Sequence, residues 1–125
     1  MASWLADYNA LILEALRDGD VALVIRKGLH DFDSLEPNEQ MRFHVWMVAH
    51  LLNAQNLYLD DTMHHDVEDQ VLRFLATMLS TKGGMQWWVT ARPIWTDAFV
   101  AHMDRLIEDA PAVTENWAFF AEAAR

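Results

Sequence analysis

Apolar residues recur every three to four positions along each long segment of the chain, which is the spacing of amphipathic helices. The first such segment follows Ser3, a residue that can cap a helix, and stops at Gly19, which suits the left-handed position after a helix. Its apolar stripe consists of Trp4, Leu5, Tyr8, Leu11, Ile12, Ala15 and Leu16. A second, shorter helix is predicted from Asp20 through Leu29. Its packing positions are Val21, Val24 or Ile25, and Leu29.

The most apolar segment begins at Pro37, which favours the first turn of a helix, and is predicted to run as a helix to about Leu59. Only one narrow face of this helix is polar or small, and it holds Arg42, Ala49, Asn53, Asn56 and Asp60. A helix that is apolar over most of its circumference is expected to be buried. The sequence therefore predicts an all-α fold, a single helical bundle of five to six helices around a central buried helix at about 37–59.

An acidic connection at 60–69 is predicted to lead into a helix that begins near Asp66. The apolar face of that helix is predicted to hold Val67, Val71, Phe74, Leu75, Met78 and Leu79. After it, Gly83 and Gly84 are expected to allow a sharp reversal of the backbone.

Two further helices are predicted near the end of the bundle: a short one at 85–92, ended by Pro93, and one capped by Thr96. The inner face of the latter is predicted to hold Phe99, Met103, Leu106 and Ala110. The bundle domain is assigned to 1–111 and a C-terminal amphipathic helical tail to 112–125. No internal repeat is recognised in the sequence.

Composition narrows the function. The 125 residues are 53% hydrophobic, as expected for one globular domain. A formal net charge of −10 disfavours nucleic acids and anionic membranes as partners. No run of about 18 apolar residues occurs, and no targeting signal is recognised, so a soluble, cytoplasmic protein outside the membrane is predicted.

Several kinds of chemistry are not supported by the residues present. The absence of cysteine excludes disulfides and thiolate catalysis. No nucleophile elbow, phosphate-binding loop or Glu-x-x-His motif occurs, so no catalytic residue, cofactor or metal site is predicted. His44 and His50 point about 120° apart on a helix, and His64 and His65 lie in the acidic connection. We therefore expect a non-enzymatic protein.

Two blocks of sequence carry a resemblance to a known family. The first contains Gly28-Leu29, a loop that ends in Ser34-Leu35, and then Glu39-x-x-Arg42-Phe43. The second contains Leu79-Ser80, then Gly83-Gly84 and Trp87-Trp88. The chain resembles a family of uncharacterised bacterial helical proteins that have both blocks. That resemblance implies an all-helical fold, no agreed activity and no catalytic residues; many family members carry an N-terminal membrane helix, which is not recognised here.

The polar face of the central helix is one candidate site. Arg42, Asn53 and Asn56 are expected either to anchor the loop at 31–36 through hydrogen bonds or to line a pocket for a small ligand.

The late aromatic residues form a second candidate, an interaction surface that comprises Trp88, Arg92, Trp117 and Phe120. Trp87 is expected to enter the core, whereas Trp88 is expected to lie at the rim under Arg92. The functional prediction is a protein-interaction module, of which a homodimer is one form. The alternative is a small-molecule-binding helical domain with a polar pocket near Arg42 and Asn53.

Overall fold

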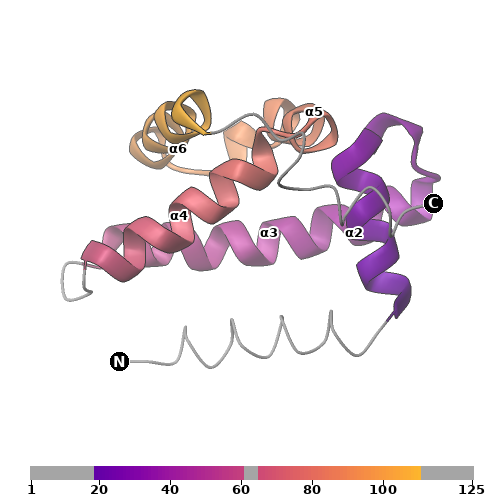
Figure 1. Cartoon of the computed structure of the whole chain (residues 1–125), viewed down its shortest axis with the longest axis horizontal. Helices are drawn as coiled ribbons and strands as arrows, with labels where there is room; N and C mark the ends of the chain where they lie inside the picture. Colours follow the sequence, from indigo (N-terminus) through magenta and orange to yellow (C-terminus); the bar gives the residue numbers. More distant parts are fainter. Residues whose placement is uncertain (1–18, 61–64, 111–125) are drawn as a thin grey trace.

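The structure is a computed structural model that describes residues 19–60 and 65–110. These residues form an all-α bundle without a strand, as the sequence predicts (Figure 1). The helices are α2 (Gly19–Asp31), α3 (Pro37–Leu59), α4 (His65–Leu79), α5 (Lys82–Ala91) and α6 (Asp97–Asp109), with 3₁₀ turns η1 (Phe32–Ser34) and η2 (Arg92–Ile94). The helix predicted after Ser3 and the tail predicted at 112–125 lie outside the described residues.

The helices are arranged around one side of α3, the longest of them (Figure 1). α2 crosses α3 near its N-terminal end and packs on both α3 and α5, while α4 packs on α3, α5 and α6. The core is formed by fully buried apolar side chains from four helices. They include Phe43, Met47 and Leu51 of α3, Leu75 and Leu79 of α4, Trp87 and Trp88 of α5, and Phe99 and Met103 of α6.

The crossing of α2 and α5 depends on glycine. A Cβ atom on Gly83 would overlap the carbonyl oxygen of Gly28, and one on Gly28 would overlap the Phe43 ring. The close approach of α5 to α2 therefore requires glycine at position 83, and the close approach of Phe43 of α3 to α2 requires glycine at position 28. The expected backbone reversal at Gly83 and Gly84 is wrong: α5 begins at Lys82, and neither glycine has a positive φ.

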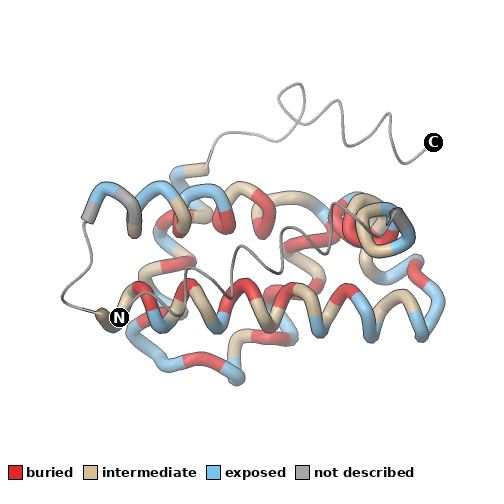
Figure 2. The backbone as a smooth tube through the Cα atoms, turned by 90° about the horizontal axis from the view of Figure 1, so that it is seen from below, coloured by how far each residue is buried: buried red, intermediate tan, exposed pale blue. Residues whose placement is uncertain are grey.

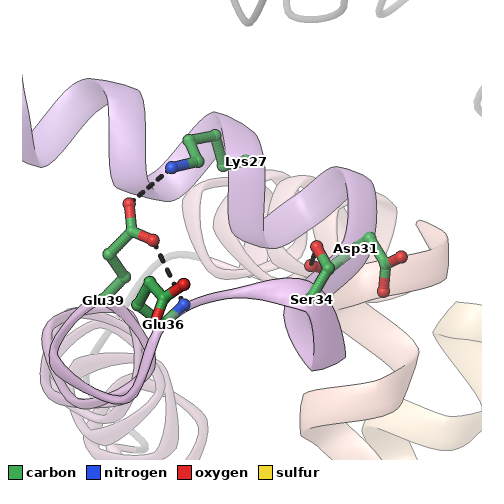
Figure 3. Close-up of polar contacts among 5 residues, drawn as sticks. All are labelled: Lys27, Asp31, Ser34, Glu36 and Glu39. Atoms are coloured by element: carbon green, nitrogen blue, oxygen red, sulfur yellow. Dashed lines mark hydrogen bonds and ion pairs between the residues drawn. The ribbon is translucent and has the colours of Figure 1, made fainter.

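At the starts of three helices, side chains accept hydrogen bonds from backbone N–H groups. At α3, the Glu36 N–H donates to Glu39 Oε1 (3.2 Å), and Lys27 Nζ donates to Glu39 Oε2 (2.6 Å), which ties α2 to α3 (Figure 3). Thr81 accepts from the Gly84 N–H at α5, and Thr96 accepts from the Phe99 N–H at α6. The cap predicted for Thr96 is thus confirmed.

A repeated unit is present that the sequence does not reveal. α2–η1–α3 and α5–η2–α6 are both a helix, a three-residue 3₁₀ turn, a buried apolar residue and a second helix, with Leu35 and Trp95 as the two buried residues. Each unit donates a backbone hydrogen bond to the other: the Asp33 N–H in η1 donates to Gln86 of α5, and the N–H of Thr96, the cap of α6, donates to Gln55 of α3. The units differ in sequence at almost every position, so only the backbone shows the repeat.

Two expectations about buried faces need correction. Phe74 was expected on the inner face of α4 but is exposed; Leu72 and Ala76 are buried there. The prediction that α3 is buried nearly all round is also wrong for the described residues, because its side opposite the core carries exposed apolar residues. From Phe43 to Leu59, buried and exposed residues both recur along α3 (Figure 2).

Candidate functional site

The structure describes two residues of the predicted aromatic interaction surface, of which Trp88 is buried and Arg92 is partly exposed. Trp88 is fully buried, and its Nε1 donates to Asp104 Oδ1 (2.8 Å), the same oxygen that accepts from the Arg92 guanidinium (3.0 Å). Trp87 is buried as well, and its Nε1 donates to His44 Nδ1 (3.0 Å). The expected difference between the two tryptophans is therefore wrong, since α5 contacts α3 through one indole and α6 through the other. Trp117 and Phe120 lie outside the described residues.

The polar face of α3 makes few contacts with the rest of the described chain. Within the described residues, Arg42 is exposed and forms no hydrogen bond or ion pair; Asn53 is half-buried and Asn56 exposed. The loop at 31–36 is instead held by two glutamines. Gln40 Nε2 donates to the Phe32 carbonyl, and Gln86 Oε1 accepts from the Asp33 N–H, each at 3.1 Å.

His50 is a buried histidine on α3 with its ring 3.9 Å, centroid to centroid, from Trp46. Burial lowers the pKa of His50 to about 4, because the charged imidazolium would lose its hydration. Its ring is thus neutral at pH 7. In the part of the chain that the structure describes, no three His, Asp or Glu side chains come together as a metal site.

One side of α3 carries several exposed apolar side chains. Met41, Val45, Leu52 and Leu59 are 62%, 58%, 48% and 56% exposed. Together with Val48, which is partly buried and packed against the core, these residues define what we call the outer face. Their spacing of four, three, four and seven residues is that of the a and d positions of a heptad repeat.

This outer face is separated from the core-facing side of α3. At about 100° per residue, its members cluster within roughly 40° of one line along α3, whereas Leu51, Met47 and Phe43 lie about 90°, 130° and 170° from that line. The stripe from Met41 to Leu59 is about 27 Å long. It is continuous except at Gln55, the remaining heptad position, whose Oε1 accepts from the Thr96 N–H (2.9 Å).

The outer face is also electrically distinct from the rest of the molecule. Residues 40–59 include no Asp or Glu, although the chain has 19 acidic residues, and Arg42 is their only Lys or Arg. On a small domain, a long apolar stripe without charges is the usual mark of an interaction surface.

Sequence reasoning missed this surface although the signal was present. The segment has two apolar periodicities, one through Phe43, Met47 and Leu51 and one through Met41, Val45 and Leu52. Apolar character all round was interpreted as burial all round. The heptad spacing of the second stripe distinguishes a helix that can pack a second helix on its exposed side from one that is buried on all sides.

Comparisons with known proteins do not indicate a function, so the outer face of α3 is the main evidence for one. No protein-family model matches the chain, and no curated protein or solved structure is significantly similar to it. The resemblance carried by Gly83-Gly84 and Trp87-Trp88 stays a prediction. Among the helices that the structure describes, none has both the length and the apolar character needed to cross a bilayer.

Proposed function

We propose that this protein is a helical interaction module that binds an amphipathic helix of a protein partner on the outer face of α3. The single observation that carries the proposal is the exposure of Met41, Val45, Leu52 and Leu59 in heptad register. A helix-in-groove or coiled-coil partner contacts such a stripe through its own residues at the same spacing.

The chemistry of the face favours a protein helix over other ligands. Apolar burial is roughly proportional to the area covered, and each aliphatic side chain that becomes buried contributes about 1.5–3 kcal/mol. The surface holds no cluster of Lys or Arg that would recognise phosphate groups.

The alternative, a small-molecule pocket near Arg42 and Asn53, has less support. Small-ligand sites are concave and enclose most of their ligand. Arg42 and Asn56 are exposed on one side of α3. Among the described residues, no other helix covers these two side chains to form a concave site.

The proposal is tested by photocrosslinking from the outer face. A benzoylphenylalanine at Val45 should capture a protein partner in the native cells, whereas one at Val89, an equally exposed valine on α5, should not. The captured partner is then purified, and its Kd for the whole protein is measured.

The double variant Val45→Glu with Leu52→Glu should raise that Kd at least about 30-fold, because each substitution removes more than a kcal/mol of apolar contact and buries a charge. Val89→Glu is the matched control and should leave the Kd unchanged. Equal affinities for all three proteins would contradict the proposed function.

A further inference from the structure

The outer face of α3, together with Gln55, has a spacing that is the same when it is read in either direction. Its members are separated by four, three, four, three and four residues; they are Met41, Val45, Val48, Leu52, Gln55 and Leu59. Two copies of such a stripe can pack antiparallel with an a position opposite a d position in every layer. The layers are Met41 with Leu59, Val45 with Gln55, and Val48 with Leu52, each occurring twice about a two-fold axis near residue 50.

We propose that the helix bound by the outer face of α3 is α3 of a second copy of this chain, in an antiparallel two-fold dimer. The inference rests on the proposed function, because it names the partner of that surface. This register uses the whole stripe, which is about 27 Å long. A shift by one heptad in either direction leaves two of the six positions of each copy without an opposite member.

The charge next to the stripe supports the antiparallel direction. Arg42, the only charged residue of 40–59, lies about 90° from the line of the outer face, on a flank that also holds Asn56 and Asp60. An antiparallel two-fold pair places this flank against the same flank of the other copy, so Arg42 lies beside Asn56 and Asp60 of the second copy. Asp60 is also the C-cap of α3, where the last carbonyl groups carry a partial negative charge that attracts a cation. Arg42 therefore meets opposite charge twice in the dimer.

A parallel pair lacks this complementarity. In that arrangement Arg42 faces the opposite flank of the second copy, at Pro37 and His44, neither of which is acidic. In the antiparallel pair the two Arg42 side chains are also kept apart, since each lies about 12 Å from the two-fold axis along the helix.

The surroundings of the stripe leave room for a second helix. Figure 1 shows α4, α5 and α6 on the same side of α3, and Met41, Val45 and Leu59 are each more than half exposed. Ala49 lies beside the two-fold axis and has only a methyl side chain, so it allows the two helices to approach closely. All 19 acidic residues lie outside 40–59, and repulsion between them is screened beyond about 8 Å at physiological salt.

Sedimentation equilibrium of the full chain tests whether a second copy is the occupant. We expect the natural protein to be a dimer at about 100 µM and to dissociate on dilution. Val45→Glu with Leu52→Glu should be monomeric at that concentration, whereas Val89→Glu, at an equally exposed valine of α5, should stay dimeric. A natural protein that stays monomeric would overturn the inference, whether another protein or a segment outside the described residues then covers the face. A dimer that the double variant does not weaken would overturn it as well.

Single cysteine variants test the direction, because the natural chain has no cysteine. Met41→Cys and Leu59→Cys are mixed in a glutathione buffer, with a tag on one of them so that the three disulfide-linked dimers separate by size. In the antiparallel pair, positions 41 and 59 of opposite copies share a layer, whereas the two copies of position 41 are about 27 Å apart. We expect the mixed disulfide to form about ten times faster than either symmetric one. Faster symmetric disulfides would show a parallel pair and overturn the inference.

The role of Arg42 is tested against an arginine elsewhere on the surface. Arg42→Glu and Arg105→Glu change the net charge equally, and Arg105 is exposed on α6. Arg42→Glu should raise the Kd of the dimer at least about fivefold more than Arg105→Glu does, because it places a carboxylate beside Asp60 of the second copy. Equal Kd values for the two variants would contradict the antiparallel contact.

Failure of this inference is distinguishable from failure of the proposed function. A benzoylphenylalanine at Val45 should capture a second copy of this chain. If it captures a different protein while the natural chain is monomeric, the dimer is wrong and the proposed function stands. If it captures nothing and the natural chain is monomeric, both are wrong.

Discussion

The two faces of α3 have almost the same composition and opposite environments. Phe43, Met47 and Leu51 on the inner face are fully buried, whereas Val45 and Leu52 on the outer face are about half exposed. Leu51 and Leu52 are adjacent and chemically identical. What separates them is the 100° between neighbouring positions on a helix and the side on which the other helices lie. One face stabilises the bundle, and we propose that the other is free for recognition.

The largest effects are expected where the inner side of the bundle is emptied. Trp87→Ala and Trp88→Ala should each lower the free energy of unfolding by about 3–5 kcal/mol, because each removes a buried indole together with its hydrogen bond to His44 or Asp104. Urea denaturation of both variants measures this. A loss below about 1 kcal/mol for Trp88→Ala would show that this indole is at the rim after all.

A second stability effect concerns the helix crossing that holds α2 on the bundle. Gly83→Ala should lower the free energy of unfolding by about 2–3 kcal/mol, because its Cβ meets backbone atoms of α2 that cannot rotate away. Val89→Ala, on the exposed side of α5, should change it by no more than about 0.5 kcal/mol. If both variants were equally stable, α2 and α5 would not be in close contact.

Acid should lower the stability of the folded protein through His50, which is buried on α3. Its pKa is about 4 in the folded protein, and the ordinary value of 6.5 applies on unfolding. Between these two pKa values the unfolded chain binds a proton that the folded chain does not. The free energy of unfolding is therefore unaffected by His50 above pH 6.5 and decreases as the pH drops toward 4. We expect a loss of about 2–3 kcal/mol between pH 7 and pH 4.5.

The control for this pH dependence is His50→Gln, which has no titrating group at the same position. Its free energy of unfolding should change less over the same interval, by the amount that His50 contributes to the natural protein. Identical slopes in the two proteins would mean that His50 is not buried in the folded state.

The smallest effect on folding is expected at the outer face. Val45→Glu with Leu52→Glu should leave the helical circular dichroism unchanged and shift the free energy of unfolding by no more than about 1 kcal/mol, since no described side chain packs on these two positions from the outside. A collapse of helical content would place these residues in the core and end the proposal of a recognition surface.

The sequence predicts much of this fold because the relevant signals are local. Helical spacing, Pro37 at the start of α3 and the Thr96 cap all depend on neighbouring residues. The role of Gly28 and Gly83 could not be predicted, because a contact between residues 55 positions apart leaves no periodicity. For the same reason Trp88 was placed at the rim: its cover comes from Asp104 on α6. The outer face of α3 was missed because spacing shows which residues share a face and does not show which face is covered.

The most direct test of the two faces compares Leu51→Ala with Leu52→Ala, which remove the same atoms from neighbouring positions. Leu51 is fully buried and Leu52 is 48% exposed. By urea denaturation, Leu51→Ala should lower the free energy of unfolding by about 2–5 kcal/mol and Leu52→Ala by about 1 kcal/mol or less. Equal losses at the two positions would contradict the division of α3 into a buried face and an exposed face.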